Sequence, residues 1–143
     1  MTAPLVITTQ EELDEALLER RETLFIKSPE EILLSVGGNA YVVATGDSHI
    51  IARDNVYVVA QDHSTIEALD QSFVSAMNHA RIIARDNSSV LARGTAHVEA
   101  WDSSIVDIRE KSQVVARDCS NIEARDSTQV FAYASSYITI LSP

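Results

Sequence analysis

Acidic and histidine side chains that could do chemistry recur in this sequence at intervals of sixteen residues. Asp107 and Glu123 form one such pair. Two carboxylates about 5 Å apart can act as the nucleophile and the general acid of a retaining glycosidase. A second series consists of Asp47, His63 and His79, which could bind a metal ion or respond to pH. Neither set can work unless a structural element places its members in one column.

The longest series at this spacing consists of five aspartates: Asp54, Asp70, Asp86, Asp102 and Asp118. Carboxylates stacked in a column repel one another unless each is satisfied by hydrogen bonds. At a corner of the chain an aspartate can accept hydrogen bonds from the backbone N–H groups of the turn, so we expect a structural turn column. The alternative is calcium, but calcium-binding β-rolls use glycine-rich turns and this chain has four glycines. We therefore predict no metal site and no cofactor.

An eight-residue repeat accounts for all three series. From Tyr41 onward the sequence aligns in blocks of eight without a gap, for example HIIARDNV, YVVAQDHS and RIIARDNS. The second residue is valine or isoleucine from Val42 through Ile138, the fourth is alanine except at Ile108 and Ile140, and the eighth is usually serine. Because strand side chains alternate between faces, these even positions predict a narrow interior and the odd positions face solvent.

The outward positions indicate how many blocks make one coil. Tyr41, Tyr57 and Phe73 recur in every second block, as do the five aspartates. A coil of two blocks fits both patterns, whereas a coil of three blocks fits neither. The sequence therefore predicts an all-β, single-stranded β-solenoid (β-helix) over residues 23–143. We expect about 16 residues per coil and about seven coils, rising ~4.8 Å per coil, with two main parallel sheets.

Residues 1–22 depart from the repeat and predict an N-terminal strand and a capping α-helix. Thr9 and Glu12 form a capping-box pattern, and the next apolar residues fall on one helical face: Leu13, Ala16 and Leu17. We expect the helix to run from about Gln10 to Arg21. Such a helix would cover the first coil, whose exposed edge would otherwise favour aggregation. The other end, SYITILSP, shows no comparable device.

The block pattern, as in IIARDNSSVLARGTAHVEAWDSS, resembles the octapeptide-repeat β-helix proteins of actinobacteria and their phages. The resemblance covers roughly residues 33–142 and implies a β-helix. It implies no activity, because that group has no shared catalytic motif. The pattern is also similar in principle to pentapeptide-repeat solenoids, some of which mimic DNA, although the five-residue phase is absent here.

Composition narrows the classes of function. The net charge of −10 argues against direct nucleic-acid binding, because a phosphate backbone requires a basic surface. No apolar run approaches the ~20 residues that span a bilayer, so we expect no membrane partner. The start of the chain, MTAPLVITTQEELDE, lacks the features of a secretory signal. Cys119 is the single cysteine and excludes an intramolecular disulfide, which makes a cytoplasmic setting the expectation.

The acidic charge leaves open that the solenoid mimics a nucleic acid and inhibits a DNA-binding enzyme. From residue 37 onward there are thirteen acids and eight bases. Eight of the acids fall at inward or corner positions, and the remaining five point outward: Asp47, Glu67, Glu99, Asp107 and Glu123. Unless the corner carboxylates are well exposed, the faces of the sheets are not acidic.

A glycan-binding or glycan-cleaving β-helix is the second alternative, based on Asp107 and Glu123. Arg93, Arg109 and Arg125 run beside these carboxylates, which favours a cluster of ion pairs. A glycan site also requires a cleft, and no long loop interrupts the coils to build one. We therefore expect no catalytic residues.

Alternate blocks carry arginine, glutamate and aromatic residues on the outward face of one sheet. An arginine such as Arg85 or Arg117 can stack on the ring of Trp101 and pair diagonally with Glu67 or Glu99. This pattern predicts a solvated, self-complementary surface. A flat recognition face is the alternative.

An outward apolar patch on the other sheet is the feature most typical of a binding surface. Its members are Tyr41, Val43, Tyr57, Val59, Phe73, Met77, Leu91 and Ile105. A contiguous apolar patch usually marks a contact, either with the N-terminal helix of the same chain or with another molecule. A second apolar region is expected at the far end: Phe131, Tyr137 and Leu141. We predict a non-catalytic interaction or scaffold protein that forms a homodimer or binds a protein partner.

Overall fold

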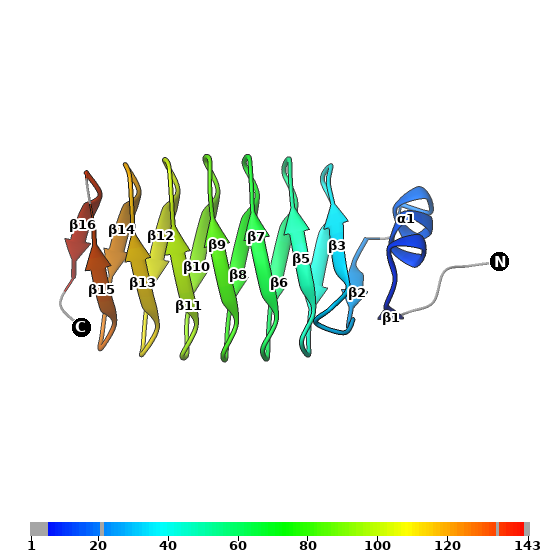
Figure 1. Cartoon of the computed structure of the whole chain (residues 1–143), viewed down its shortest axis with the longest axis horizontal. Helices are drawn as coiled ribbons and strands as arrows, with labels where there is room; N and C mark the ends of the chain where they lie inside the picture. Colours follow the sequence, from blue (N-terminus) through cyan, green and yellow to red (C-terminus); the bar gives the residue numbers. More distant parts are fainter. Residues whose placement is uncertain (1–5, 21, 134, 142–143) are drawn as a thin grey trace.

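The computed structural model describes residues 6–20, 22–133 and 135–141. They form a parallel β-solenoid with a short helix near the N-terminus (Figure 1). The solenoid has about eight turns, about 16 residues apart. The predicted fold class and the two-block coil are confirmed. The structure has about one turn more than predicted, because the strand at Val6–Ile7, which precedes the predicted start of the solenoid at residue 23, also joins the stack.

The strands of the described residues form two parallel sheets. Consecutive strands alternate between the sheets, so each residue lies beside the residue sixteen positions later. The nine-stranded sheet contains β1 (Val6–Ile7), β2 (Leu24–Ile26), β4 (Tyr41–Ala44), β6 (Tyr57–Ala60), β8 (Phe73–Ala76), β10 (Ser89–Ala92), β12 (Ile105–Ile108), β14 (Asn121–Ala124) and β16 (Tyr137–Ile140). The seven-stranded sheet contains β3 (Leu33–Val36), β5 (His49–Ala52), β7 (Thr65–Ala68), β9 (Arg81–Ala84), β11 (His97–Ala100), β13 (Gln113–Ala116) and β15 (Gln129–Ala132).

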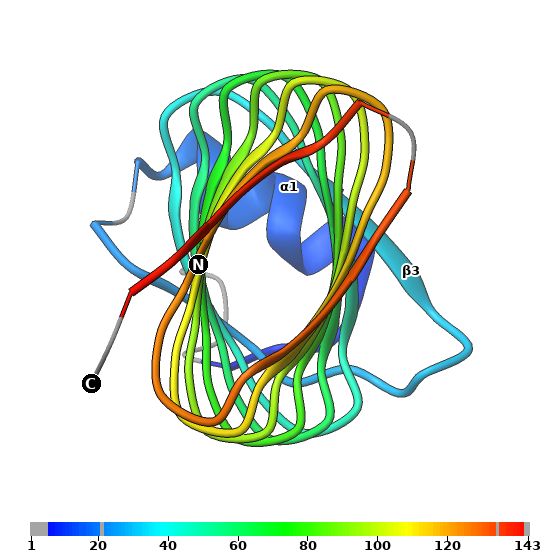
Figure 2. The same cartoon turned by 90° about the vertical axis from the view of Figure 1, so that its left-hand side faces the viewer.

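The core lies between the two sheets and follows the repeat. The second and fourth residues of each block are at most 2% exposed from Val42 to Ala124. The serines at the eighth position of these blocks are fully buried, for example Ser64 and Ser104. Small alanine and serine side chains at two of every three inward positions let the sheets approach closely, and Figure 2 shows the resulting flattened tube in end view.

The chain turns sharply at the sixth residue of each block. Most of these residues have a positive φ, between 52° and 61° for the non-glycine ones, and glycine takes the same place at Gly46 and Gly94. This left-handed conformation costs most L-residues roughly 1–2 kcal/mol, and Asp, Asn and Gly tolerate it best. The preference for aspartate at the corners therefore has a conformational cause as well as a polar one.

Helix α1 (Gln10–Leu18) begins with the predicted capping box. The Thr9 hydroxyl accepts a hydrogen bond from the Glu12 backbone N–H, and the Glu12 carboxylate accepts one from the Thr9 backbone N–H. The helix ends at Leu18, so the prediction that it reaches Arg21 is wrong. Arg20 has φ 55°, which breaks the right-handed backbone, and Arg21 lies outside the described residues.

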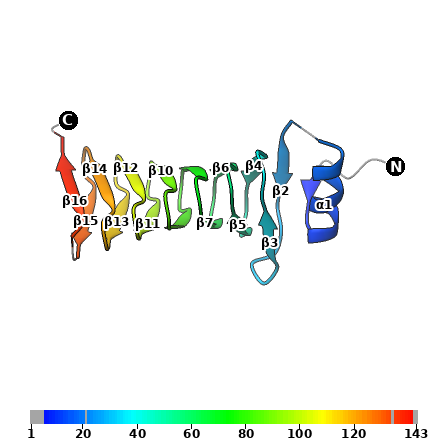
Figure 3. The ribbon, with the colours of Figure 1, turned by 90° about the horizontal axis from the view of Figure 1, so that it is seen from above.

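The helix lies across the N-terminal end of the solenoid, with Leu13 and Ala16 buried against the first coil (Figure 3). Gln10 fixes it to β3, the edge strand of the seven-stranded sheet. The Gln10 amide donates to the carbonyl of Ser35 at 3.0 Å and accepts from the backbone N–H of Ser35 at 2.8 Å. The side chain thus replaces the neighbouring strand that this edge lacks, which is how an exposed sheet edge is protected.

The C-terminal coil is less covered. Val130 and Ile138 are only partly buried, and Ile140 is 76% exposed although it occupies a core position of its block. The second apolar region expected here is divided between two faces. Phe131 lies on β15 in the seven-stranded sheet, whereas Tyr137 lies on β16 in the nine-stranded sheet.

Ile82 and Ile83 provide a direct test of the inward and outward assignment. They are neighbours on β9, and Ile82 is 1% exposed whereas Ile83 is half-buried on the outer face. We expect Ile82→Ala to lower the free energy of unfolding by about 2–5 kcal/mol, because it leaves a cavity in the core. Ile83→Ala should cost no more than about 1 kcal/mol, since only partly exposed area is lost. Urea unfolding of both variants would measure this, and equal losses would contradict the assignment.

Candidate functional site

The apolar face of the nine-stranded sheet is organised by a column of stacked aromatic rings. Tyr41, Tyr57 and Phe73 begin consecutive strands of this sheet and are direct register partners. The rings of Tyr41 and Tyr57 lie 5.0 Å apart at 8°, and those of Tyr57 and Phe73 lie 4.8 Å apart at 18°. Tyr41 remains 40% exposed, because α1 covers the end of the solenoid and leaves this sheet face open.

A second apolar column lies beside the rings. Val6, Phe25, Val43 and Val59 are register partners along β1, β2, β4 and β6. Val6 and Phe25 are each 50% exposed and line a depression of about 300 Å³ together with Val43. Val6 and Phe25 were not predicted to belong to this patch, because both precede the first clear block. The signal that could have found Phe25 is its neighbour Ile26, which is in phase with the inward positions.

The eight residues of the predicted patch all lie on the outer side of this one sheet. Ser75 follows Val59 in one column, and Ser89 follows Phe73 in the other. Ser75 is only 8% exposed, so little of it reaches the surface between Val59 and Leu91. Met77 directly follows β8, and Ile105, which is exposed, shares β12 with the outward Asp107. That the patch extends as far as Ile105 stays a prediction.

Over the strands from β1 to β10 the outer face of the nine-stranded sheet carries no carboxylate among the described residues, whereas β12 and β14 carry Asp107 and Glu123. The cations along this stretch are Lys27 and Arg93, each directly after a strand. On a chain with net charge −10, the absence of carboxylates on these strands lowers the repulsion between two copies that meet through them.

The two carboxylates considered for catalysis lie side by side and are neutralised by arginines. Asp107 and Glu123 are register partners on β12 and β14. Arg109 donates to both carboxylate oxygens of Asp107, at 3.3 and 3.1 Å, and Arg125 forms an ion pair with Glu123. The hydrogen bond and charge of Asp107 raise the pKa of Arg109 above its usual value. The geometry therefore matches the ion-pair cluster that the neighbouring arginines indicated.

The outer face of the seven-stranded sheet satisfies its own charges, as the sequence predicted. Arg85 lies 3.8 Å from Glu67, and Arg117 lies 3.7 Å from Glu99. Both guanidinium groups also approach the ring of Trp101, at 5.6 and 4.8 Å from its centroid. Such partly exposed pairs contribute little stability individually, but they give Arg85 and Arg117 partners within their own sheet.

Each aspartate of the turn column accepts a hydrogen bond from the coil before it. The carboxylate of Asp86 accepts from the backbone N–H of Asp70 at 3.1 Å, and Asp102 accepts from Asp86 at the same distance. Asp54, Asp70 and Asp118 make the equivalent contacts. The donor is thus the sixth residue of the previous coil. All five side chains are exposed, so the corner carboxylates do contribute to the acidic surface.

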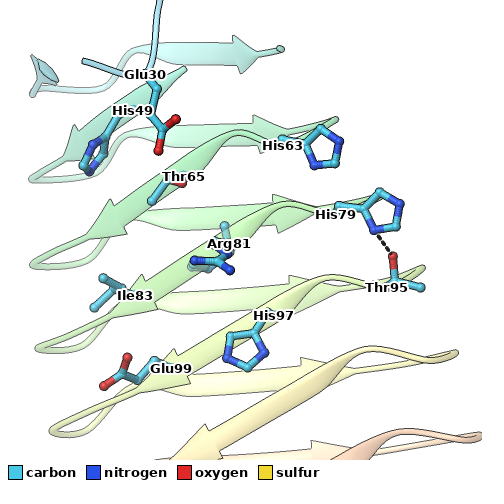
Figure 4. Close-up of a pocket in the computed structure, with 11 residues that line it drawn as sticks. Glu30, His49, His63, Thr65, His79, Arg81, Ile83, Thr95, His97 and Glu99 are labelled. Carbon is cyan, nitrogen blue, oxygen red and sulfur yellow. Dashed lines mark hydrogen bonds between the residues drawn. The ribbon is translucent and has the colours of Figure 1, made fainter. Parts of the chain in front are cut away.

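The predicted histidine column lies along a groove of about 690 Å³ on the edge of the seven-stranded sheet (Figure 4). His63 and His79 stack with ring centroids 5.2 Å apart, whereas Asp47 is not among the lining residues. His49 and His97 line the same groove, which the sequence analysis missed. They occupy the first position of a block. The small residue before each, Ser48 or Ala96, is buried, so the first and seventh positions on either side of it come to one edge.

Comparisons with known proteins assign the chain to no family. No family model matches the chain, and no curated protein or solved structure matches it.

Asp86 allows the two roles of the corner aspartates to be separated. We expect Asp86→Ala to lower the free energy of unfolding by about 1–3 kcal/mol, because alanine is strained at φ 55° and lacks the hydrogen bond to Asp70. Asp86→Asn should keep most of the stability, since its amide oxygen can still accept and asparagine tolerates this backbone. Thermal unfolding would measure both. An alanine variant as stable as the asparagine variant would contradict the structural role.

Proposed function

We propose that this protein is a non-catalytic interaction scaffold that self-associates through the apolar face of its nine-stranded sheet. The observation that carries the proposal is the stacked column of Tyr41, Tyr57 and Phe73, on strands of this face that have no outward carboxylate. Exposed apolar area of this kind, extended by Phe25 and Val6, is typical of a protein contact. Aromatic residues are enriched in such interfaces, whereas Asp and Glu are depleted.

A second copy of the chain is the partner that this face fits best. A two-fold interface uses the same patch on both molecules, so an uncharged, flat column of rings meets an equally uncharged one. A strongly charged partner would place unpaired charges against Tyr57 and Val59, and desolvating these charges would be costly. The rigid solenoid also needs little reordering on association, which lowers the entropic cost of binding.

The two alternative functions have less support. Mimicry of a nucleic acid would use the exposed aspartates from Asp54 to Asp118, which follow one another at about 4.8 Å along one edge. Double-stranded DNA carries one charge per about 1.7 Å of its axis, so the match in charge density is poor. Glycan cleavage would use Asp107 and Glu123, but both carboxylates are held by arginines.

We place the protein in the cytoplasm. Its cysteine, Cys119, is free and exposed, as is typical of a reducing compartment. Within the described residues no helix has the length and apolar character needed to cross a bilayer. The resemblance to octapeptide-repeat β-helix proteins agrees with a scaffold, since it implies a shared fold without a shared reaction.

The proposal predicts that Tyr57→Glu converts a dimer into a folded monomer. The substitution places a charge in the middle of the ring column, where two copies would bring their carboxylates together. Light scattering coupled to size-exclusion chromatography would give the mass, and circular dichroism would confirm the fold. We expect the native chain to have twice the monomer mass and the variant to show at least a tenfold weaker association, in line with the loss of an interface hot spot.

Thr65→Glu is the matched control, because Thr65 begins β7 on the opposite sheet and is half-buried like Tyr57. It adds the same charge and should leave the dimer intact. A native chain that is monomeric at micromolar concentration would overturn self-association. Equal loss of the dimer in both variants would show that charge alone, and not this face, controls the mass.

A further inference from the structure

The chain has four histidines, and all of them line the groove at the edge of the seven-stranded sheet. Two come from strand starts, His49 on β5 and His97 on β11, and two from corners, His63 and His79. Figure 4 shows these side chains around Arg81, which lies near the middle of the group. The groove belongs to the sheet opposite the apolar face, so it is independent of the proposed interface.

Two columns of side chains form the groove. Register pairing places His49, Thr65, Arg81 and His97 in one column along β5, β7, β9 and β11. The corners supply the other column, which consists of His63, His79 and Thr95. Every member of the two columns therefore has a neighbour about 4.8 Å away along the solenoid. This arrangement presents several hydrogen-bond donors to one elongated space.

Arg81 is exposed and has no carboxylate partner among the described residues. Four other arginines each pair with Asp or Glu: Arg85, Arg109, Arg117 and Arg125. The carboxylates that line the groove are Glu30 and Glu99, and neither forms an ion pair with Arg81; Glu99 is paired with Arg117. The guanidinium of Arg81 is thus available to a ligand, and its planar fork suits an oxyanion.

The hydrogen bond between His79 and Thr95 determines which ring nitrogen of His79 carries a proton in the neutral form. The Thr95 hydroxyl donates to the carbonyl of Asn78 at 2.9 Å, so its oxygen accepts from Nδ1–H of His79 at 2.6 Å. With Nδ1 protonated, neutral His79 has no proton on Nε2. Protonation of the ring adds one there and makes His79 a donor on both sides.

We propose that this groove binds a multiply charged oxyanion of the phosphate or carboxylate type, with Arg81 as its main anchor. His79 and His97 add donors beside it, and Thr65 contributes a hydroxyl. A metal ion is not the expected ligand, because no three His, Cys, Asp or Glu side chains of the described residues converge on one point. The chemistry of the site is therefore that of a donor-rich anion groove on an otherwise acidic protein.

Binding strengthens as pH falls from 8 to 6, the range in which histidine ordinarily gains its charge. Around His79 the other titratable and charged groups of the groove are His49, His63 and His97 with Arg81, and Glu30 and Glu99 oppose them. Asp47 occupies the same corner column as His63, one coil closer to the N-terminus.

The test is calorimetric titration of the full chain with sodium tripolyphosphate in metal-free buffer at pH 6. We expect saturable binding that Arg81→Gln weakens by at least about tenfold, because a charge-assisted bidentate contact is lost. Arg53→Gln is the matched control: it removes the same charge from the same sheet, but Arg53 does not line the groove. This control should bind within about twofold of the native chain, since only long-range charge is lost.

A second titration at pH 8 tests the histidines. Native binding should weaken more between pH 6 and pH 8 than binding by His79→Gln. The change in charge of the probe itself is common to both chains and cancels in this comparison. Citrate as a competitor distinguishes the source of the oxyanion: full displacement supports a carboxylate ligand, and no displacement supports a phosphate ligand.

Three results would overturn the proposal. The first is absence of saturable binding at pH 6, and the second is equal weakening by Arg81→Gln and Arg53→Gln. The third is tight one-to-one binding of Zn²⁺ by the native chain that blocks the anion, which would make the groove a metal site. None of these results bears on the dimer, because Arg81 and Tyr57 lie on opposite sheets.

Discussion

The parallel register of sixteen residues is the constraint on which the rest of this molecule depends. Backbone hydrogen bonds between successive coils hold each residue beside its counterpart in the next coil, at the strand spacing of about 4.8 Å. Inside, this requires side chains that can stack on copies of themselves without a gap, which valine, isoleucine and alanine do. A core this narrow tolerates no shift by one residue, because such a shift would bring Tyr57 inside and Val58 outside. Variation is therefore confined to the odd positions and the corners.

Columns of like side chains create a problem that the protein solves in three ways. Aromatic residues stack, as in the column from Tyr41 to Phe73, and like neighbours then attract one another. On the seven-stranded sheet arginines alternate with rings, as with Arg117 between Trp101 and Tyr133, so that no two cations of this column are adjacent. Aspartates cannot do either, and each is instead satisfied by a backbone N–H of the previous coil. This corner N–H group lies outside the strands and has no partner in the sheet hydrogen bonding. The aspartate carboxylate supplies that partner, and the N–H group in turn stabilises the carboxylate.

The fold could be predicted because it depends on periodicity, which a sequence displays directly. The phase of Val42 to Ile138 determines the inward face, and the recurrence of Tyr41, Tyr57 and Phe73 determines the length of the coil. Sites formed by residues from different positions of the repeat were harder to predict. His97 lies in the same groove as His79 only because the alanine between corner and strand, Ala80 or Ala96, is buried and brings the seventh and first positions to one edge. The helix end at Leu18 also escaped prediction, because the helical face gives no signal for the left-handed backbone at Arg20.

The same constraint separates the two candidate surfaces. The sheets lie back to back across a core of aliphatic and alanine side chains, and the apolar face and the groove are on opposite sides of it. Coupling between distant sites requires an element with two discrete arrangements that both sites bias. A close-packed stack of Val74, Ile82 and Val90 has one arrangement, since any alternative would break the register of every later coil. The proposed association through one sheet would therefore leave the affinity of the groove unchanged, and the proposed dimer would present two identical grooves on its outer faces.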